Sequence, residues 1–108
     1  MLVRVNVTEE HIANGRIGSC YACPVALAMK TVLNEQSYPT VGSYSIRLRR
    51  PITGQQLAKL PVIAPVHMFI GRFDSRLHVD PFEFAIEVPD LWLKKEISDA
   101  GASNPEAH

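Results

Sequence analysis

Alternating apolar and polar residues predict three strands in this chain. Residues 2–7, Leu-Val-Arg-Val-Asn-Val, repeat with a period of two, and residues 43–50 and 81–88 do the same. This period is typical of a strand that buries one of its two faces. In the second of these strands we expect Tyr44 to face the core.

A return strand is expected after residues 43–50. Residues 51–54, Pro-Ile-Thr-Gly, have the composition of a hairpin turn. Residues 55–60 then run back as a short partner strand. The sequence Gln-Gln-Leu-Ala-Lys-Leu also suits a helical turn, so the pattern leaves both interpretations open.

Apolar residues spaced three and four apart predict two main helices. The first begins at Cys23 or Pro24 and ends near Asn34, because its apolar residues fall on one side of a helical plot. Those residues are Val25, Ala26, Ala28, Met29, Val32 and Leu33. The second helix covers residues 65–75, where apolar side chains recur at positions i, i+3, i+4 and i+7.

Two short helical turns are expected as well. Thr8 caps the first turn, and Asn14-Gly15 gives that turn a left-handed stop. Asp90, directly after Pro89, caps the second turn.

Together these elements predict an α+β fold, a small mostly antiparallel sheet with two main helices on one face. Residues 1–97 form a single domain in this prediction, and residues 98–108, which lack apolar content, form a disordered tail. No apolar run approaches the ~18 residues that cross a bilayer. The N-terminus also lacks the apolar core of a signal peptide. We therefore expect a cytoplasmic protein with no membrane partner.

The charge of the chain argues against a nucleic-acid partner. Eleven Lys and Arg residues balance eleven Asp and Glu, so the net charge is zero and attracts no polyanion. Arg47 and Arg49 point outward from their predicted strand, on the face opposite Tyr44. We interpret them as a solvated strand face, because RNA-binding sheets combine cations with aromatic rings. The outward Glu83 and Glu87 can pair with these arginines across the sheet.

Cys20 and Cys23 form a Cys-x-x-Cys pair at the start of the first main helix. One interpretation is a thioredoxin-like redox pair, since a helix N-terminus lowers a thiol pKa, but no strand–helix–strand unit precedes it. A second is a zinc site with Cys20, Cys23 and His11 as ligands. His67 or His78 would then supply the fourth ligand that zinc normally needs. A third is that both thiols simply pack the start of the helix.

An interaction role is favoured over catalysis. No Ser-His-Asp set, phosphate-binding glycine loop or readable pair of carboxylates occurs, so we expect a protein that is not an enzyme and has no cofactor unless zinc binds. Four apolar residues have no place in the predicted core and form a candidate interaction surface: Leu27, Leu91, Trp92 and Leu93. Such a surface suits a partner protein or a second copy of the chain, and we expect a two-fold homodimer.

Several short motifs resemble a pattern in small uncharacterised proteins of bacteriophages and prophages. They are Cys-Pro-Val-Ala-Leu-Ala at residues 23–28, Thr-Glu-Glu-His-Ile at 8–12, Phe-Asp at 73–74 and Pro-Phe-Glu-Phe at 81–84. The resemblance implies an accessory protein, phage-encoded, that binds a host protein and inhibits or modulates it. The alternative is a zinc-stabilised or thiol-redox domain that uses the cysteine pair.

Overall fold

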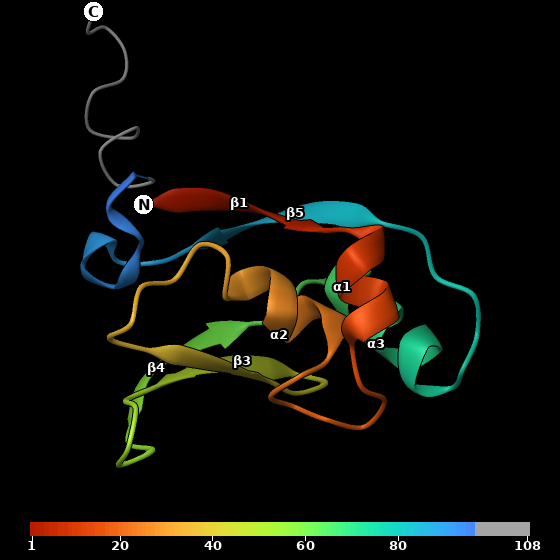
Figure 1. The fold of residues 1–108 in the computed structure, drawn as a ribbon, viewed down its shortest axis with the longest axis horizontal. Helices are drawn as coiled ribbons and strands as arrows, with labels where there is room; N and C mark the ends of the chain where they lie inside the picture. Colours follow the sequence, from red (N-terminus) through yellow and green to blue (C-terminus); the bar gives the residue numbers. More distant parts are fainter. Residues whose placement is uncertain (97–108) are drawn as a thin grey trace, which may run out of the picture.

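Two antiparallel sheets and three helices make up the described part of the chain (Figure 1). The structure is a computed structural model, and it describes residues 1–96. In chain order the elements are β1 (Leu2–Val7), α1 (Glu9–Asn14), α2 (Pro24–Met29), β2 (Tyr38–Val41), β3 (Ser45–Arg49), β4 (Gln56–Pro61), α3 (Ala64–Asp74), β5 (Phe82–Glu87) and the 3₁₀ turn η1 (Asp90–Trp92). The predicted α+β class is confirmed.

The first sheet joins the N-terminus to the segment before η1. β1 and β5 pair antiparallel along their whole length, from Leu2 opposite Glu87 to Val7 opposite Phe82. The alternation of β1 places its valines on the buried face, as the sequence predicts. The N-terminal amine extends the pairing by donating a hydrogen bond to the backbone oxygen of Val88 (2.9 Å).

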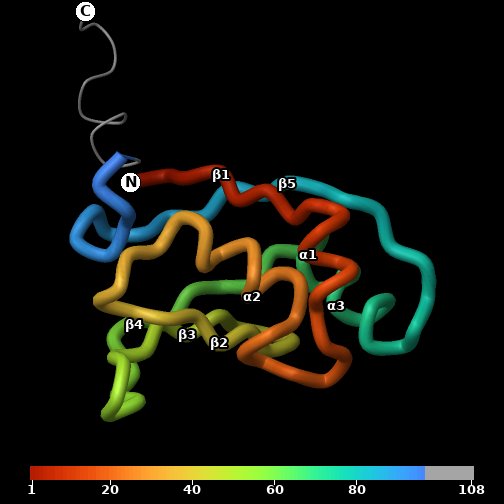
Figure 2. The backbone as a smooth tube through the Cα atoms, viewed as in Figure 1, coloured from red at the N-terminus to blue at the C-terminus, as the bar shows by residue number. Residues whose placement is uncertain are grey.

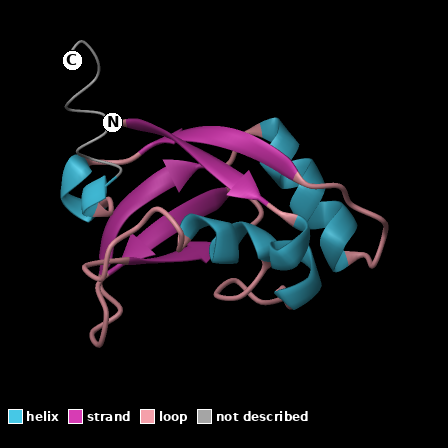
Figure 3. Cartoon of the chain, turned by 45° about the horizontal axis from the view of Figure 1, so that its top comes forward, coloured by secondary structure: helices cyan, strands magenta, loops and turns pink. Residues whose placement is uncertain are grey.

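The second sheet is a meander in the order β2-β3-β4 (Figure 3). Its inner face carries Ile46 and Leu48, which are almost completely buried, while Arg47 and Arg49 alternate with them on the outer face. β3 and β4 are joined by a turn in which two residues have positive φ angles, Ile52 (72°) and Gly54 (73°). This turn extends away from the rest of the fold (Figure 2).

Helix α2 lies between the two sheets (Figure 1). It contacts β1 of the first sheet and β2 of the second. Each of its residues except Leu27 is buried, and Met29 has no exposed surface. The finer arrangement therefore differs from the predicted one. The strands form two sheets instead of one, and α2 fills the space between them instead of covering an outer face.

α2 is also shorter than its apolar pattern predicts, because it ends at Met29 and not near Asn34. The amide of Val32 donates to the carbonyl of Met29 (3.1 Å) in a tighter turn. Leu33 then forms an isolated antiparallel bridge with Leu93. The side-chain amide of Asn34 donates to the backbone oxygen of Leu93 (3.1 Å). Pairing with a distant segment thus replaces the last turns of the expected helix.

The elements with the strongest local patterns lie where the sequence predicts them. β1 has the predicted bounds, α3 is a helix, and residues 56–61 form a strand and not a helical turn. The prediction that Tyr44 faces the core is wrong, because its side chain is 84% exposed. β3 begins at Ser45, so Tyr44 lies in the loop before the strand. Gly15 has φ −72°, so it is not the left-handed stop that the sequence suggests.

No helix within residues 1–96 is long and apolar enough to cross a membrane. The predicted tail, residues 98–108, lies outside the described residues, and so does the predicted end of the domain at residue 97.

We expect Met29→Ala to lower the free energy of unfolding by about 2–5 kcal/mol, because it leaves a cavity between the two sheets. Denaturant unfolding followed by circular dichroism measures the loss. Met68→Ala is the matched control: Met68 is 64% exposed on α3, so its truncation changes stability by about 0.5 kcal/mol or less. Equal losses in the two variants would contradict the central position of α2.

Candidate functional site

The two cysteines lie in different environments. Both are free thiols, with Cys20 exposed and Cys23 buried. Cys23 is the N-cap of α2, and its Sγ accepts a hydrogen bond from the amide of Ala26 (3.4 Å). Cys20 is held in the preceding loop, where its carbonyl oxygen accepts a hydrogen bond from the amide of Val41 (2.8 Å). The Cys23 side chain thus has a structural role as the cap of the helix, whereas Cys20 contributes only its backbone to this loop.

The environment of Cys23 does not favour a thiolate. Burial raises the pKa of the Cys23 thiol above its ordinary value, and this outweighs the hydrogen bonds from Ala26 and Val25, which lower it. A cysteine that attacks as a nucleophile needs the opposite shift, because the thiolate is the reactive form. Cys23 is therefore unsuited to be the attacking thiol, which leaves only the exposed Cys20 for that role. The thioredoxin-like interpretation stays a prediction.

The predicted zinc ligands are not brought together. The Nδ1 atom of His11 accepts a hydrogen bond from the backbone of Thr8 (3.1 Å), which completes a capping box at the start of α1. His67 contacts the carbonyl of Ser43, and His78 contacts Asp80. Among residues 1–96 no group of three or more His, Cys, Asp or Glu side chains is arranged to hold a metal ion. The expected set of Cys20, Cys23 and His11 is therefore not assembled, because His11 serves as a helix cap.

The predicted interaction surface is only partly exposed. Leu93 is 3% exposed and belongs to the core, so the expectation that it lies on the surface is wrong. Its burial follows from the bridge that it forms with Leu33. Leu27 is half-buried, and Trp92 is half-buried against the core. Only Leu91 is well exposed, at 63%.

Leu91 and Trp92 nevertheless border a hollow in the surface, which we call the Trp92 hollow. Its volume is about 430 Å³, and its other lining residues are Gln36, Arg50, Pro51 and Leu57. These residues come from three separate parts of the chain, so only the folded structure assembles them.

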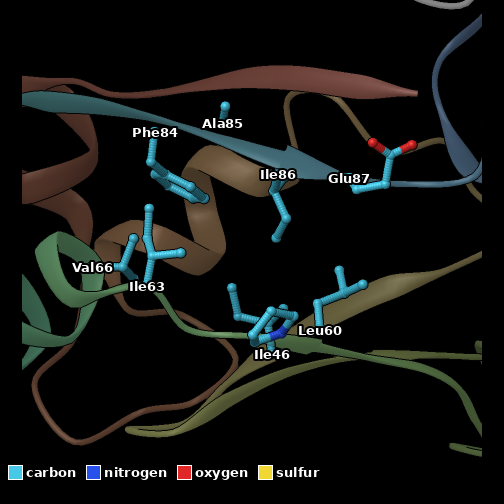
Figure 4. Close-up of a pocket in the computed structure, with 9 residues that line it drawn as sticks. Ile46, Leu60, Ile63, Val66, Phe84, Ala85, Ile86 and Glu87 are labelled. Carbon is cyan, nitrogen blue, oxygen red and sulfur yellow. The ribbon is translucent and has the colours of Figure 1, made fainter.

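A second hollow, which the sequence does not reveal, lies between the two sheets (Figure 4). It has a volume of about 140 Å³ and a mainly apolar lining. We call it the intersheet groove, and its lining residues are Ile46, Leu60, Pro61, Ile63, Val66, Phe84, Ala85, Ile86 and Glu87. Figure 4 shows Phe84 and Ile86 pointing from β5 into the gap. Phe84 lies on the side of Ile63 and Val66, and Ile86 points toward Ile46 and Leu60 of the opposite sheet.

The groove is bordered by two strand edges. β5 pairs with β1 on one side only, and β4 pairs with β3 on one side only, within the residues that the structure describes. Four consecutive residues of β5, from Phe84 to Glu87, line the groove. Because neighbouring side chains point to opposite faces of a strand, this run shows that the edge of the backbone itself borders the groove.

No protein-family profile, curated protein or solved structure matches the chain. The resemblance to phage proteins therefore remains an expectation from short motifs.

We expect Cys20 to react quickly with a thiol reagent such as Ellman's reagent in the native protein, and Cys23 to stay protected until the chain unfolds. Burial and the raised pKa of Cys23 both oppose its reaction. Absorbance during labelling, with and without denaturant, measures both thiols. Cys20→Ser should abolish native labelling, whereas Cys23→Ser should leave it unchanged. Fast native labelling of Cys23 would contradict the structural role.

Proposed function

We propose that this chain is a non-enzymatic interaction protein that binds an extended apolar segment of a partner protein in the intersheet groove. The observation that carries the proposal is the open edge of β5, which borders the apolar gap. A strand edge offers a row of unpaired amide and carbonyl groups, and an added strand satisfies them.

The chemistry of the groove favours a polypeptide in extended form. Along such a peptide every second side chain would point to the same side, as Phe84 and Ile86 do on β5. Those side chains would enter the gap between the sheets and pack against its apolar lining residues. Main-chain hydrogen bonds would then supply affinity, and the pockets for alternate side chains would supply specificity.

The two edges that border the groove differ in their suitability for pairing. β4 ends at Pro61, which has no amide hydrogen, and it carries the exposed Lys59. Both features typically protect an edge strand from pairing with other chains. β5 contains no proline between Phe82 and Glu87. We therefore assign the incoming segment to β5, with the residues of β4 as the opposite wall.

The source of the partner is a further part of the proposal. The motif resemblance described above supports a phage-encoded accessory protein whose partner is a host protein, in the cytoplasm.

Selection of a random displayed peptide library on the folded protein tests this function. We expect enrichment of peptides with apolar residues at alternate positions. Ile63→Lys should weaken their binding by about tenfold or more, because it places a charge at the rim of an apolar groove. Isothermal titration calorimetry measures the loss.

Ile17→Lys is the matched control for this experiment. Ile17 is 44% exposed and Ile63 is 42% exposed, but only Ile63 lines the groove. N-methylation of alternate peptide amides should also weaken binding, since it removes main-chain donors. Peptides that bind both lysine variants equally well, or that tolerate every N-methyl group, would sink the proposal.

We further propose that the chain forms a homodimer through the Trp92 hollow. Trp92 packs partly against the core, so its truncation would disturb the fold as well as an interface. Leu91→Lys is the cleaner variant, because Leu91 is exposed. Multi-angle light scattering should report a dimer for the native chain and a monomer for Leu91→Lys. A monomeric native chain at high concentration would end the idea.

A further inference from the structure

The zero net charge of the chain conceals a strong separation of charge along the sequence. Residues 36–73 contain Arg47, Arg49, Arg50, Lys59 and Arg72, and no Asp or Glu at all. This segment includes the whole of the second sheet. The acidic residues lie before and after it, so one sheet is basic although the protein as a whole is neutral.

The expected neutralisation of Arg47 and Arg49 by glutamates does not occur. Glu83 and Glu87 belong to β5, which is in the other sheet. There Glu83 pairs with Arg4 (3.4 Å), and Glu87 pairs with the N-terminal amine. Among residues 1–96 no ion pair involves Arg47, Arg49 or Lys59.

The strand register gathers polar and aromatic residues in two rows across the outer face of the second sheet. Tyr38 of β2 lies opposite Arg49 of β3, which lies opposite Gln56 of β4. In the next row, Thr40 lies opposite Arg47, which lies opposite Lys59. With Tyr21 these residues form what we call the tyrosine–arginine face.

Tyr21 belongs to this face although it precedes α2 in the chain. Its ring lies 6.1 Å from that of Tyr38, centroid to centroid, and 53% of Tyr21 is exposed. Tyr21, Arg47 and Arg49 line one shallow hollow of about 120 Å³ together with Thr40. The face therefore combines an exposed aromatic ring with unpaired cations in one concave place.

One of the arginines is held in a fixed position. The Nε atom of Arg49 donates to the hydroxyl of Thr40 (3.3 Å), and its Nη1 atom donates to the carbonyl of Gly54 (3.1 Å). These bonds hold the guanidinium across the sheet and restrict its rotation. A cation held in this way loses less conformational freedom when it binds an anion.

We propose that the tyrosine–arginine face binds single-stranded nucleic acid. The arginines and the lysine attract the phosphates, and none of them is paired with a carboxylate of residues 1–96. Tyr21 and Tyr38 provide rings on which about two bases stack, as is usual in single-strand binding. An acidic polypeptide would need the cations but no ring to stack on. The exposed Tyr21 ring therefore favours single-stranded nucleic acid over an acidic polypeptide as the ligand. The face lies on the opposite side of β3 and β4 from the intersheet groove, so the inference goes beyond the proposed function.

Fluorescence anisotropy with a fluorescein-labelled single strand of about 12 nucleotides tests the inference, at about 50 to 200 mM salt. Tyr21→Ala should weaken binding about tenfold with an unchanged salt dependence, because it removes stacking. Tyr21→Phe should bind normally. Arg47→Ala with Lys59→Ala should weaken binding and lower the salt slope by about 0.7 for each phosphate that the variant no longer neutralises.

Two control variants separate this face from the rest of the surface. Tyr44→Ala removes a more exposed tyrosine, whose ring lies against His67 of α3 and outside the face. Arg4→Ala removes an exposed cation of the other sheet. Neither should weaken binding, and thermal unfolding checks that every variant is folded.

Three results would overturn the inference. The first is no binding of the strand at the lowest salt concentration. The second is equal binding of polyglutamate with no effect of Tyr21→Ala, which would make the face a site for acidic polypeptides. The third is tighter binding of a duplex than of a single strand of the same length.

Discussion

The packing of α2 between the two sheets is the constraint on which the rest of the structure depends. A helix is about 10 Å across, whereas paired strands lie about 4.8 Å apart. With α2 in contact with both β1 and β2, the sheets cannot close on that side. On the other side β5 and β4 do not pair with each other either, and mainly apolar residues line the gap between them. The intersheet groove is thus a direct consequence of a buried helix of six residues.

The features that could be predicted from the sequence are those fixed by near neighbours in the chain. β1 and β5 alternate without interruption, and each has the bounds, within one residue or two, that the alternation indicates. α3 has four apolar residues on one face, which is enough to overcome the glycine in its interior. In these segments the residues that the periodicity places on one face are also the residues that the fold buries. The local pattern is therefore sufficient to predict the element.

Prediction fails where a distant segment competes with the local pattern. The apolar residues after Met29 continue a helical period, yet Leu33 gains a strand bridge to Leu93 and both become buried. The bridge to Leu33 also explains why Leu93 is buried, although the sequence predicts that it lies on the surface. His11 fails as a metal ligand for a similar reason, since a capping bond from the Thr8 backbone already uses its Nδ1 atom.

The intersheet groove is beyond sequence reasoning because it depends on the order of the strands. Phe84 and Ile86 are recognisable as the buried face of a strand, but only strand order shows that this strand is an edge. The zero net charge of the whole chain hides the basic sheet, although residues 36–73 contain no Asp or Glu. Only the strand register shows which of its cations lie side by side.

The intersheet groove and the tyrosine–arginine face share β3 and β4 and use opposite faces of these strands. Leu60 lines the intersheet groove, while Lys59, its neighbour, stands in the outer row beside Arg47. Since successive side chains of a strand point to opposite sides, a peptide in the groove and a nucleic acid on the outer face would not collide there. The two sites are therefore connected through β3 and β4. Coupling between them would require both strands to shift together, and the pairing of β3 with β2 opposes such a shift.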